Sequence, residues 1–256
     1  MSWSPDQYLK FSQARLRPAI DLLNRIGLTA PRRIYDLGCG AGNVTVAILD
    51  RWPHARITGV DNSAPMLAQA RKLLPQVQWT LKRLDEWRPD VPPDLIYSNA
   101  AIQWLPDHQH LLPALIDTLA PGGVLAVQMP RNFSAPSHTL IAQVARSGKW
   151  RSKLESLLGP PPVAEPAVYY SMLSPLSGSI DIWESEYLQA LSGADPVKEW
   201  TRGTALIPFL DRLDPSEQAE FENDYARCLR DAYPPRADGT TLFPFRRLFI
   251  VLQKAA

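Results

Sequence analysis

The sequence has little cysteine, no long apolar run and no recognisable secretory signal. Among its 256 residues only Cys39 and Cys228 are cysteines, which is too few for a disulfide framework or a cysteine-based zinc site. No apolar stretch approaches the roughly 18–20 residues of a membrane span, and the N-terminus lacks the basic and apolar regions of a secretory signal. We therefore expect a cytoplasmic protein with no membrane partner and no bound metal.

An excess of charge of one sign is also missing. The chain has 27 Lys and Arg side chains against 26 Asp and Glu, so its formal net charge is +1. Proteins that hold nucleic acids mainly by their phosphates rely on a strong positive field, so we expect no nucleic-acid partner. The hydrophobic fraction of 45% is ordinary for a globular protein, and the length fits one large domain with an insertion. The oligomeric state stays open.

What the sequence does contain is a regular alternation of short strands and helices. Residues 1–27 are predicted to form two helices, one starting at Ser4-Pro5-Asp6 and one at Pro18. Strands are then expected at 33–37, 56–61, 77–81, 94–98 and 123–129, with helices at 41–51, 64–74 and 111–119. This order is typical of right-handed βαβ units and predicts an α/β fold with a mostly parallel, Rossmann-like sheet.

The alternation stops after Pro130. Residues 131–178 are rich in proline, a strand is expected at 180–187, and helices are expected at 194–206 and 215–233. An apolar strand at 248–252 follows. We therefore divide the chain into N-terminal helices and an α/β core at 1–130, a mostly helical substrate lid at 131–244 that includes one core strand near 180–187, and a final core strand at 245–256.

A glycine-rich stretch, DLGCGAG at 36–42, follows the first strand and precedes a helix. It fits neither the dinucleotide fingerprint, whose third glycine is missing, nor the P-loop, whose Gly-Lys-Ser/Thr is missing. Asp36 would repel a phosphate but suits a cationic ligand. Asp61 ends the second strand, where a carboxylate accepts hydrogen bonds from ribose hydroxyls. A ribose, an ammonium group and no pyrophosphate together describe S-adenosylmethionine.

The segments YDLGCGAGNVT and GVDNS resemble motifs I and II of class I S-adenosylmethionine-dependent methyltransferases. The resemblance implies that Gly38 and Gly40 line the methionine part of the cofactor and that Asp61 binds its ribose. This family often has an aspartate at the end of the third strand, where this sequence has Arg83, so the adenine contact falls to Leu84 or Asp85. The full set of implied cofactor residues is Asp36, Gly38, Cys39, Gly40, Asp61, Asn62, Met66, Leu84, Asp85 and Asn99.

Longer segments identify the acceptor class. WSPDQYLKFSQARLRPA, SNAAIQWLPDH, LAVQMPRNF and FRRLFIV resemble the trans-aconitate 2-methyltransferase family over nearly the whole chain, and the motif of enzymes that methylate nucleic-acid bases is missing after the fourth strand. The resemblance implies the class I methyltransferase sheet, whose last strand is antiparallel. It also implies methyl transfer from S-adenosylmethionine to a carboxylate of a small polycarboxylic acid, with trans-aconitate as the expected acceptor and a monomethyl ester and S-adenosylhomocysteine as products.

The chemistry of such a reaction indicates which side chains to look for. A carboxylate is already ionised at neutral pH, so we expect no general base. The site must instead neutralise the carboxylates that do not react, and the planar fork of arginine is suited to this task. We rank Arg247 first because it precedes an apolar strand, and Arg131 second because it follows the fifth strand. The other acceptor-binding candidates are Arg246, Arg202, Trp104, Tyr8 and Tyr170.

Two alternatives stay open at this stage. The acceptor could instead be the carboxylate of a malonyl carrier protein or the hydroxyl of a quinol. The chain could also be a non-catalytic module that binds S-adenosylmethionine, in which no arginines converge on the methyl group. The histidines indicate no metal site, because His108 and His110 have poor helical spacing and are expected on a loop.

Overall fold

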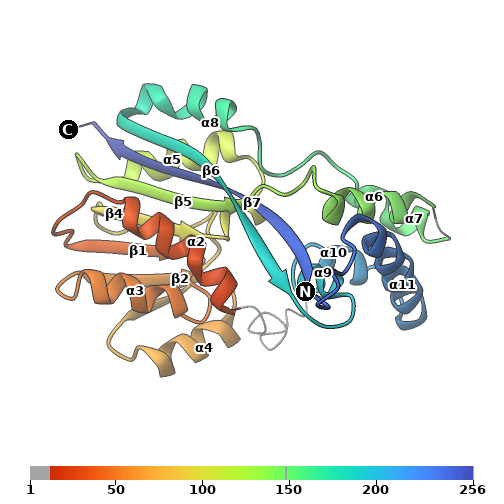
Figure 1. Ribbon diagram of the computed structural model, residues 1–256. Coiled ribbons are helices and arrows are strands. Elements are labelled where there is room, and N and C mark those ends of the chain that lie inside the picture. The colour runs from red at the N-terminus through yellow and green to blue at the C-terminus, as the bar shows by residue number, and fades with distance from the viewer. Residues whose placement is uncertain (1–11, 148, 256) are drawn as a thin grey trace. The chain divides into compact units, whose positions relative to one another are not determined.

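The computed structural model describes residues 12–147 and 149–255, with side chains from Leu16 onward (Figure 1). The expected helix start at Ser4-Pro5-Asp6 and the candidate Tyr8 lie outside these residues. The described chain divides into two compact units. The sheet unit holds residues 15–130, 162–185 and 247–255, and the helical unit holds residues 131–161 and 186–246.

The sheet has seven strands in the order β3-β2-β1-β4-β5-β7-β6. Neighbouring strands from β3 to β5 are parallel, and β7 pairs antiparallel with β5. This arrangement confirms the predicted α/β fold with an antiparallel last strand. The strands are β1 (Arg33–Leu37), β2 (Arg56–Asp61), β3 (Gln78–Leu81), β4 (Leu95–Asn99), β5 (Val124–Pro130), β6 (Ser177–Leu191) and β7 (Thr241–Lys254).

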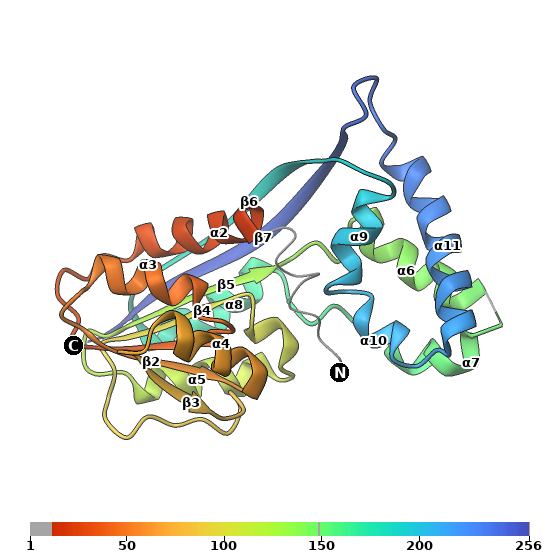
Figure 2. The ribbon, with the colours of Figure 1, turned by 90° about the horizontal axis from the view of Figure 1, so that it is seen from below.

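Helices cover both faces of the sheet. In Figure 2, α2 and α3 lie on one side of the strands and α5 lies on the other. Because both faces are covered, β4 and β5 are buried along nearly their whole length and read as apolar runs. The helices of the sheet unit are α2 (Ser12–Arg25), α3 (Asn43–Arg51), α4 (Ala64–Leu73), η1 (Ile102–Trp104), α5 (His108–Thr118), α8 (Pro166–Leu173) and η3 (Ser174–Leu176).

Helix α2 differs from the expectation. The described helix runs through Pro18 without a break, whereas we expected a new helix to start there. A proline inside a helix removes one backbone hydrogen bond and costs roughly 3 kcal/mol. Ala19, Leu22 and Leu23 of this helix are buried, as is Ile26 just after it, and their burial offsets that cost.

Three further local expectations differ from the structure. His108 and His110 lie in the first turn of α5 rather than on a loop, because Asp107 adopts a left-handed conformation that turns the chain directly into the helix. The strand expected at 180–187 extends over 177–191, and the helix expected at 194–206 is confined to 196–202. The strand expected at 248–252 begins seven residues earlier and runs over Thr241–Lys254. The other expected elements within the described residues lie within about three residues of the predicted positions.

The helical unit has an apolar core of its own. Large aromatic side chains dominate it, among them Trp150, Trp200, Phe221, Tyr225 and Phe243. Its helices are α6 (Pro136–Ser147), α7 (Arg151–Leu154), η2 (Glu155–Leu157), α9 (Pro196–Arg202), α10 (Ile207–Leu210) and α11 (Pro215–Ala232). Helix α6 lies in the proline-rich stretch where the sequence analysis assigned no element. Its proline is the first helical residue, where the missing N–H costs little.

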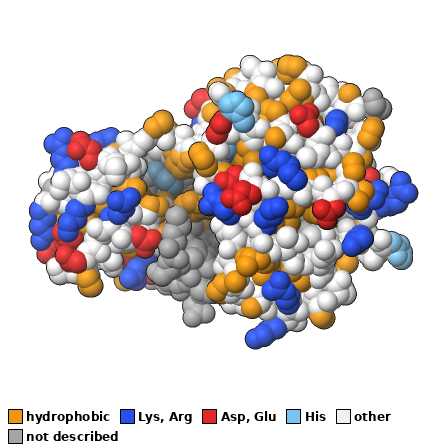
Figure 3. All heavy atoms as spheres, turned by 180° about the vertical axis from the view of Figure 1, so that it is seen from behind, with side chains coloured by type: hydrophobic (Ala, Val, Ile, Leu, Met, Phe, Trp, Pro, Cys, Tyr) orange, Lys and Arg blue, Asp and Glu red, His pale blue; other side chains and the backbone are white. Residues whose placement is uncertain are grey.

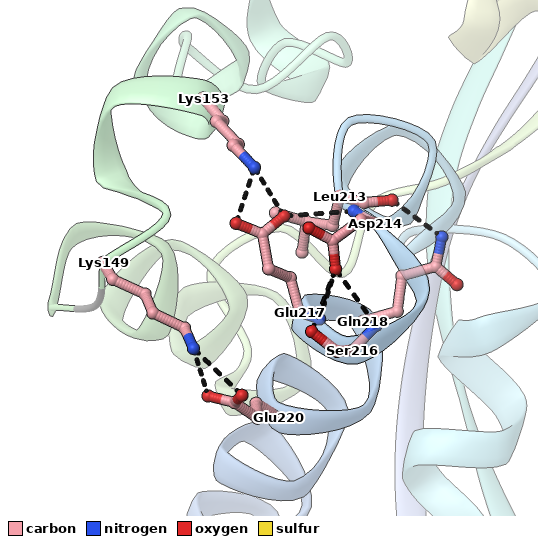
Figure 4. A network of polar contacts seen from close by, with 8 residues as sticks. All are labelled: Lys149, Lys153, Leu213, Asp214, Ser216, Glu217, Gln218 and Glu220. Atoms are coloured by element: carbon pink, nitrogen blue, oxygen red, sulfur yellow. Dashed lines mark hydrogen bonds and ion pairs between the residues drawn. The ribbon is translucent and has the colours of Figure 1, made fainter.

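The longest helix of this unit, α11, begins with a capping box. The Asp214 carboxylate accepts backbone hydrogen bonds from the first turn, and Glu217 accepts one from the Asp214 N–H. Lys153 lies 2.6 Å from Glu217, and Lys149 lies 2.7 Å from Glu220, so both lysines tie the α7 region to α11 (Figure 4). The cap and the ion pairs fix the start of the helix.

The segment 162–185 groups with the sheet unit, although it falls inside the 131–244 insertion drawn from the sequence. Helix α8 shows why. The buried Tyr169 hydroxyl lies 2.7 Å from Nδ1 of His108 on α5, and the ring of His108 also lies 2.9 Å from the carbonyl of Ile102 through Nε2. A buried polar contact of this kind holds α8 on the sheet unit.

The surface carries charges of both signs. On the face shown in Figure 3, acidic and basic side chains are interspersed. In the part of the chain that the structure describes, no helix combines the length and the apolar character needed to cross a membrane.

Candidate active site

The glycine-rich loop connects β1 to α3 and is tied to the end of β2. The N–H groups of Gly38 and Cys39 donate to the carbonyl of Val60, at 2.8 and 3.2 Å. Gly38, Gly40 and Gly42 all have positive φ angles, of 76°, 55° and 85°. Side chains other than glycine rarely adopt such angles, so the sequence of the loop follows from its backbone path.

Close packing within the protein explains why position 38 must be glycine. A Cβ at Gly38 would lie 2.1 Å from the Cβ of Ala101, so the glycine is required by the chain that follows β4. We expected this glycine to make room for a ligand. A Cβ at Gly40 would meet only the end of the Met66 side chain, at 3.3 Å.

Asp61 ends β2 and faces this loop. Its Oδ2 accepts a hydrogen bond from the N–H of Gly40 (2.9 Å), and its Oδ1 accepts one from the N–H of Ser63 (2.8 Å). An ionised carboxylate has about four acceptor positions, so these two bonds leave acceptor capacity on both oxygens. A pair of hydroxyl donors, such as those of a ribose, fits the remaining capacity.

Asp36 is the second carboxylate of this region, and it is buried. Burial raises the pKa of Asp36 to about 7, although the Thr45 hydroxyl, which donates to Oδ2 at 2.6 Å, opposes the rise. The nearby charge of Asp61 adds to the pKa rise. A cation bound beside Asp36 would favour its ionised form. Sequence reasoning missed Thr45.

The remaining implied cofactor residues lie in the loops after β1, β2 and β3, at the end of β4 and in the first turn of α4. Met66 and Leu84 are buried, and Asn62 is exposed. The guanidinium of Arg83 hydrogen-bonds to Asp85 (2.5 Å) and lowers the pKa of that carboxyl. Asp85 therefore already has a partner within its own turn. Cys39 is a buried thiol whose pKa is raised by burial, which suits packing rather than reaction.

A second polar group follows along the same edge of the sheet. Gln128 on β5 is fully buried, and its Oε1 accepts a hydrogen bond from Nη1 of Arg247 on β7 (3.3 Å). Arg247 is only 5% exposed, so the arginine ranked first from the sequence lies in the sheet rather than on the surface. Sequence reasoning missed Gln128. The signal was a lone polar residue inside the apolar strand LAVQMP.

The other acceptor candidates have different surroundings. The side chains of Trp104 and Tyr170, in the sheet unit, are more than half exposed. Arg131, Arg202 and Arg246 belong to the helical unit. Within it, Arg202 pairs with Glu222 (2.9 Å) and Arg246 lies 3.8 Å from Glu186. The structure thus brings Arg247 together with Gln128. Among the described residues it forms no cluster of three or more His, Cys, Asp or Glu side chains that could hold a metal.

Opposite charges therefore lie at the end of the sheet where the parallel strands finish, and we call this end the polarised edge. Asp36 and Asp61 lie on β1 and β2, and Arg247 lies on β7, at the same end of the sheet because it pairs with Pro130 of β5. With strands about 4.8 Å apart, β1 and β7 are separated by about 14 Å. This edge can hold a cationic ligand and an anionic one next to each other.

Relatives of known name agree with this chemistry. Residues 34–123 match a family model described as a methyltransferase domain. Over 99% of both chains, the sequence is 46% identical to a trans-aconitate 2-methyltransferase from Methylobacterium radiotolerans. It is also 46% identical to a protein of the same name from Azoarcus sp., over 98% of both chains.

Solved structures share the fold at much lower identity. A putative methyltransferase from Bacillus halodurans superposes with a TM-score of 0.61 at 11% identity, covering 94% of this chain and all of that one. Phosphoethanolamine N-methyltransferase 2 from Haemonchus contortus, in complex with S-adenosylhomocysteine, gives a TM-score of 0.55 at 15% identity. It covers 94% of this chain and 53% of that one.

Proposed function

Because this chain belongs to the trans-aconitate 2-methyltransferase family, we propose that it transfers a methyl group from S-adenosylmethionine to a carboxylate of trans-aconitate. The products are the monomethyl ester and S-adenosylhomocysteine. The observation that carries the proposal is the polarised edge of the sheet, with Asp36 and Asp61 on one side and the buried Arg247 on the other. These groups suit a cationic cofactor and an anionic acceptor.

The cofactor half of the site is formed by the loop after β1 and the end of β2. When bound, S-adenosylmethionine supplies an electrophilic methyl group on a positively charged sulfur. Asp61 has the acceptor capacity to take the ribose hydroxyls, and Asp36 supplies negative charge toward the ammonium group. Met66 and Asn62 are proposed to flank the adenine, with Leu84 or Asp85 at its amino group.

The acceptor half needs charge neutralisation more than proton transfer. The attacking carboxylate of trans-aconitate is ionised at neutral pH, so no side chain has to remove a proton. The carboxylates that do not react must be neutralised, because a buried unpaired charge is costly. Arg247 is already buried and held by Gln128, so it can do this without reorganising.

We also propose further cations for the acceptor. Arg131 follows β5 directly and is the strongest of these candidates, with Arg202 and Arg246 after it. Trp104 and Tyr170 are proposed as aromatic walls from the sheet unit.

A cytoplasmic location fits the two cysteines, which are both free thiols.

A methyl-transfer assay tests the function directly. The purified chain is incubated with S-adenosylmethionine and, in separate reactions, trans-aconitate, cis-aconitate, isocitrate and a malonyl thioester. We expect trans-aconitate to give the highest kcat/KM and its monomethyl ester to be found by mass spectrometry. Faster transfer to the malonyl thioester, or no transfer to any of these acids, would exclude the proposed acceptor.

A further inference from the structure

Gln128 is a buried side chain in which only one of the two polar ends forms a hydrogen bond to another described residue. Its Oε1 accepts a hydrogen bond from Arg247, and because a guanidinium can only donate, this bond fixes which end of the amide is oxygen. The Nε2 end is then a donor. It is buried, and among the described residues it has no hydrogen-bond partner. A buried donor without a partner is rare in proteins and points to a ligand that supplies the acceptor.

The neighbours of Gln128 define the face on which this donor lies. Tyr97 on β4 donates to the carbonyl of Ala19, which places its side chain on the α2 side of the sheet. Asn99, two residues later, lies on the same side because strand side chains alternate. Gln128 is in register with Asn99, and Arg247 reaches Gln128, so all three share this side.

Asn99, Gln128 and Arg247 form a row across β4, β5 and β7, and the two ends of this row differ in chemistry. Oδ1 of Asn99 is buried and, within the described residues, also lacks a hydrogen-bond partner, but it is an acceptor and suits a ligand that donates. Gln128 Nε2 and the guanidinium of Arg247 are donors and suit an anion. The row therefore changes from a cation-binding to an anion-binding character between Asn99 and Gln128.

We propose that Gln128 is a specificity-determining residue that binds a carboxylate of the acceptor. Nε2 donates to an oxygen of the carboxylate that Arg247 neutralises, while Oε1 holds the guanidinium in place. Two donors on the attacking carboxylate would withdraw charge from its oxygen, so we assign them to a carboxylate that does not react. This inference rests on the proposed function, and it predicts a requirement for a polycarboxylic acid.

Two substitutions separate the roles of the two ends. Gln128→Glu keeps an acceptor for Arg247 but replaces the donor by a negative charge. Gln128→Met removes both polar ends at similar volume. Gln78→Glu is the matched control, because Gln78 on β3 accepts a hydrogen bond from Arg56 on β2 (3.2 Å) in an exposed pair of the same kind. Binding of trans-aconitate is measured by calorimetry on protein saturated with S-adenosylhomocysteine, together with kcat/KM.

We expect Gln128→Met to raise the Kd of trans-aconitate by about 10- to 100-fold, the effect of losing hydrogen bonds to a charged group. Gln128→Glu should raise it further because of repulsion. The affinity for S-adenosylhomocysteine should not change in either variant, and Gln78→Glu should behave as the unmodified chain.

A Gln128→Glu variant that binds trans-aconitate as tightly as the unmodified chain would overturn the proposal, because support of Arg247 alone survives that change. If this variant does not fold, an unchanged Kd in Gln128→Met overturns it instead. If the unmodified chain neither binds nor methylates trans-aconitate, the proposed function fails and the inference with it.

Discussion

At the residue scale, two carboxylates of one loop region serve different purposes because their surroundings differ. Asp61 is partly exposed and accepts two backbone hydrogen bonds. Asp36 is buried, with Thr45 as its hydrogen-bond donor. The proposed roles follow from this difference: Asp61 is an acceptor for hydroxyl groups, and Asp36 is a carboxyl whose ionisation responds to a nearby cation.

Replacing Asp61 tests the cofactor site. We predict that Asp61→Ala weakens binding of S-adenosylmethionine by about 1–3 kcal/mol, since charge-assisted hydrogen bonds are lost. Isothermal titration calorimetry measures the change. Asp50→Ala, at an exposed position of α3, serves as the control and should bind normally. An unchanged affinity in Asp61→Ala would rule out the ribose assignment.

The raised pKa of Asp36 predicts a pH dependence of stability. In the unfolded chain this carboxyl loses its proton near pH 4, whereas in the folded protein it keeps the proton up to about pH 7. Its contribution to the free energy of unfolding is therefore fully present below pH 4 and is lost as the pH rises to about 7. The loss amounts to at most about 4 kcal/mol.

Urea denaturation between pH 4.5 and 7.5 measures this loss. Asp36→Asn keeps an acceptor for Thr45 but cannot ionise, so its stability should fall less over the same range. Parallel pH profiles of the two proteins would show that Asp36 titrates normally.

The positions of residues that belong to a sequence motif could be predicted from the sequence. The glycine loop and Asp61 could be placed because backbone conformation and strand ends constrain them locally. Gln128 could not, because a single polar residue in an apolar strand does not reveal its partner, which is 119 residues away. The reason for Gly38 was also hidden, since Ala101 is distant in the sequence.

At the element scale, α8 is held on the sheet unit by a buried polar contact. The Tyr169 hydroxyl contacts Nδ1 of His108 and accepts a hydrogen bond from the N–H of Ala164 (3.3 Å). We predict that Tyr169→Phe lowers the free energy of unfolding by about 1–3 kcal/mol, because buried polar groups lose their partner. Chemical denaturation measures this effect.

The neighbouring tyrosine provides the control. Tyr170 is 56% exposed, so Tyr170→Phe should leave stability unchanged. Equal stability of both variants and the unmodified chain would show that the contact does not hold α8.

The predicted element boundaries were right where the hydrophobic pattern of the sequence is strong. They were wrong where contacts with distant residues determine the boundary. The strands of the α/β core could be predicted because buried parallel strands read as apolar runs. Pro18 was interpreted as a helix start, but α2 continues through it because neighbouring side chains are buried. The proline-rich stretch after β5 hid α6, because its proline sits at the first helical position.

At the scale of the whole molecule, the described chain divides into a sheet unit and a helical unit. The alternation of strands and helices was enough to predict the fold, whereas the grouping of 162–185 with the sheet unit depends on contacts between residues far apart in the sequence. Arg247 belongs to the sheet unit and Arg131 to the helical unit. The implied cofactor residues all belong to the sheet unit.

Arg131→Ala tests the second-ranked acceptor candidate. We predict a loss of kcat/KM for trans-aconitate equivalent to about 2–5 kcal/mol, the usual effect of removing one partner of a desolvated charge pair. The affinity for S-adenosylhomocysteine should be unchanged. Arg146→Ala, at an exposed position of α6, is the control. Normal turnover by Arg131→Ala would remove the helical unit's first candidate from the site.

The most direct test is the kcat/KM of Arg247→Lys for trans-aconitate, measured beside its affinity for S-adenosylhomocysteine. Lysine keeps the positive charge but cannot hold Gln128 and a carboxylate with one planar fork. We predict at least about a tenfold fall in kcat/KM, with the cofactor affinity unchanged. Turnover of trans-aconitate at the unmodified rate, or an equal loss of cofactor affinity, would contradict carboxylate recognition by the buried arginine.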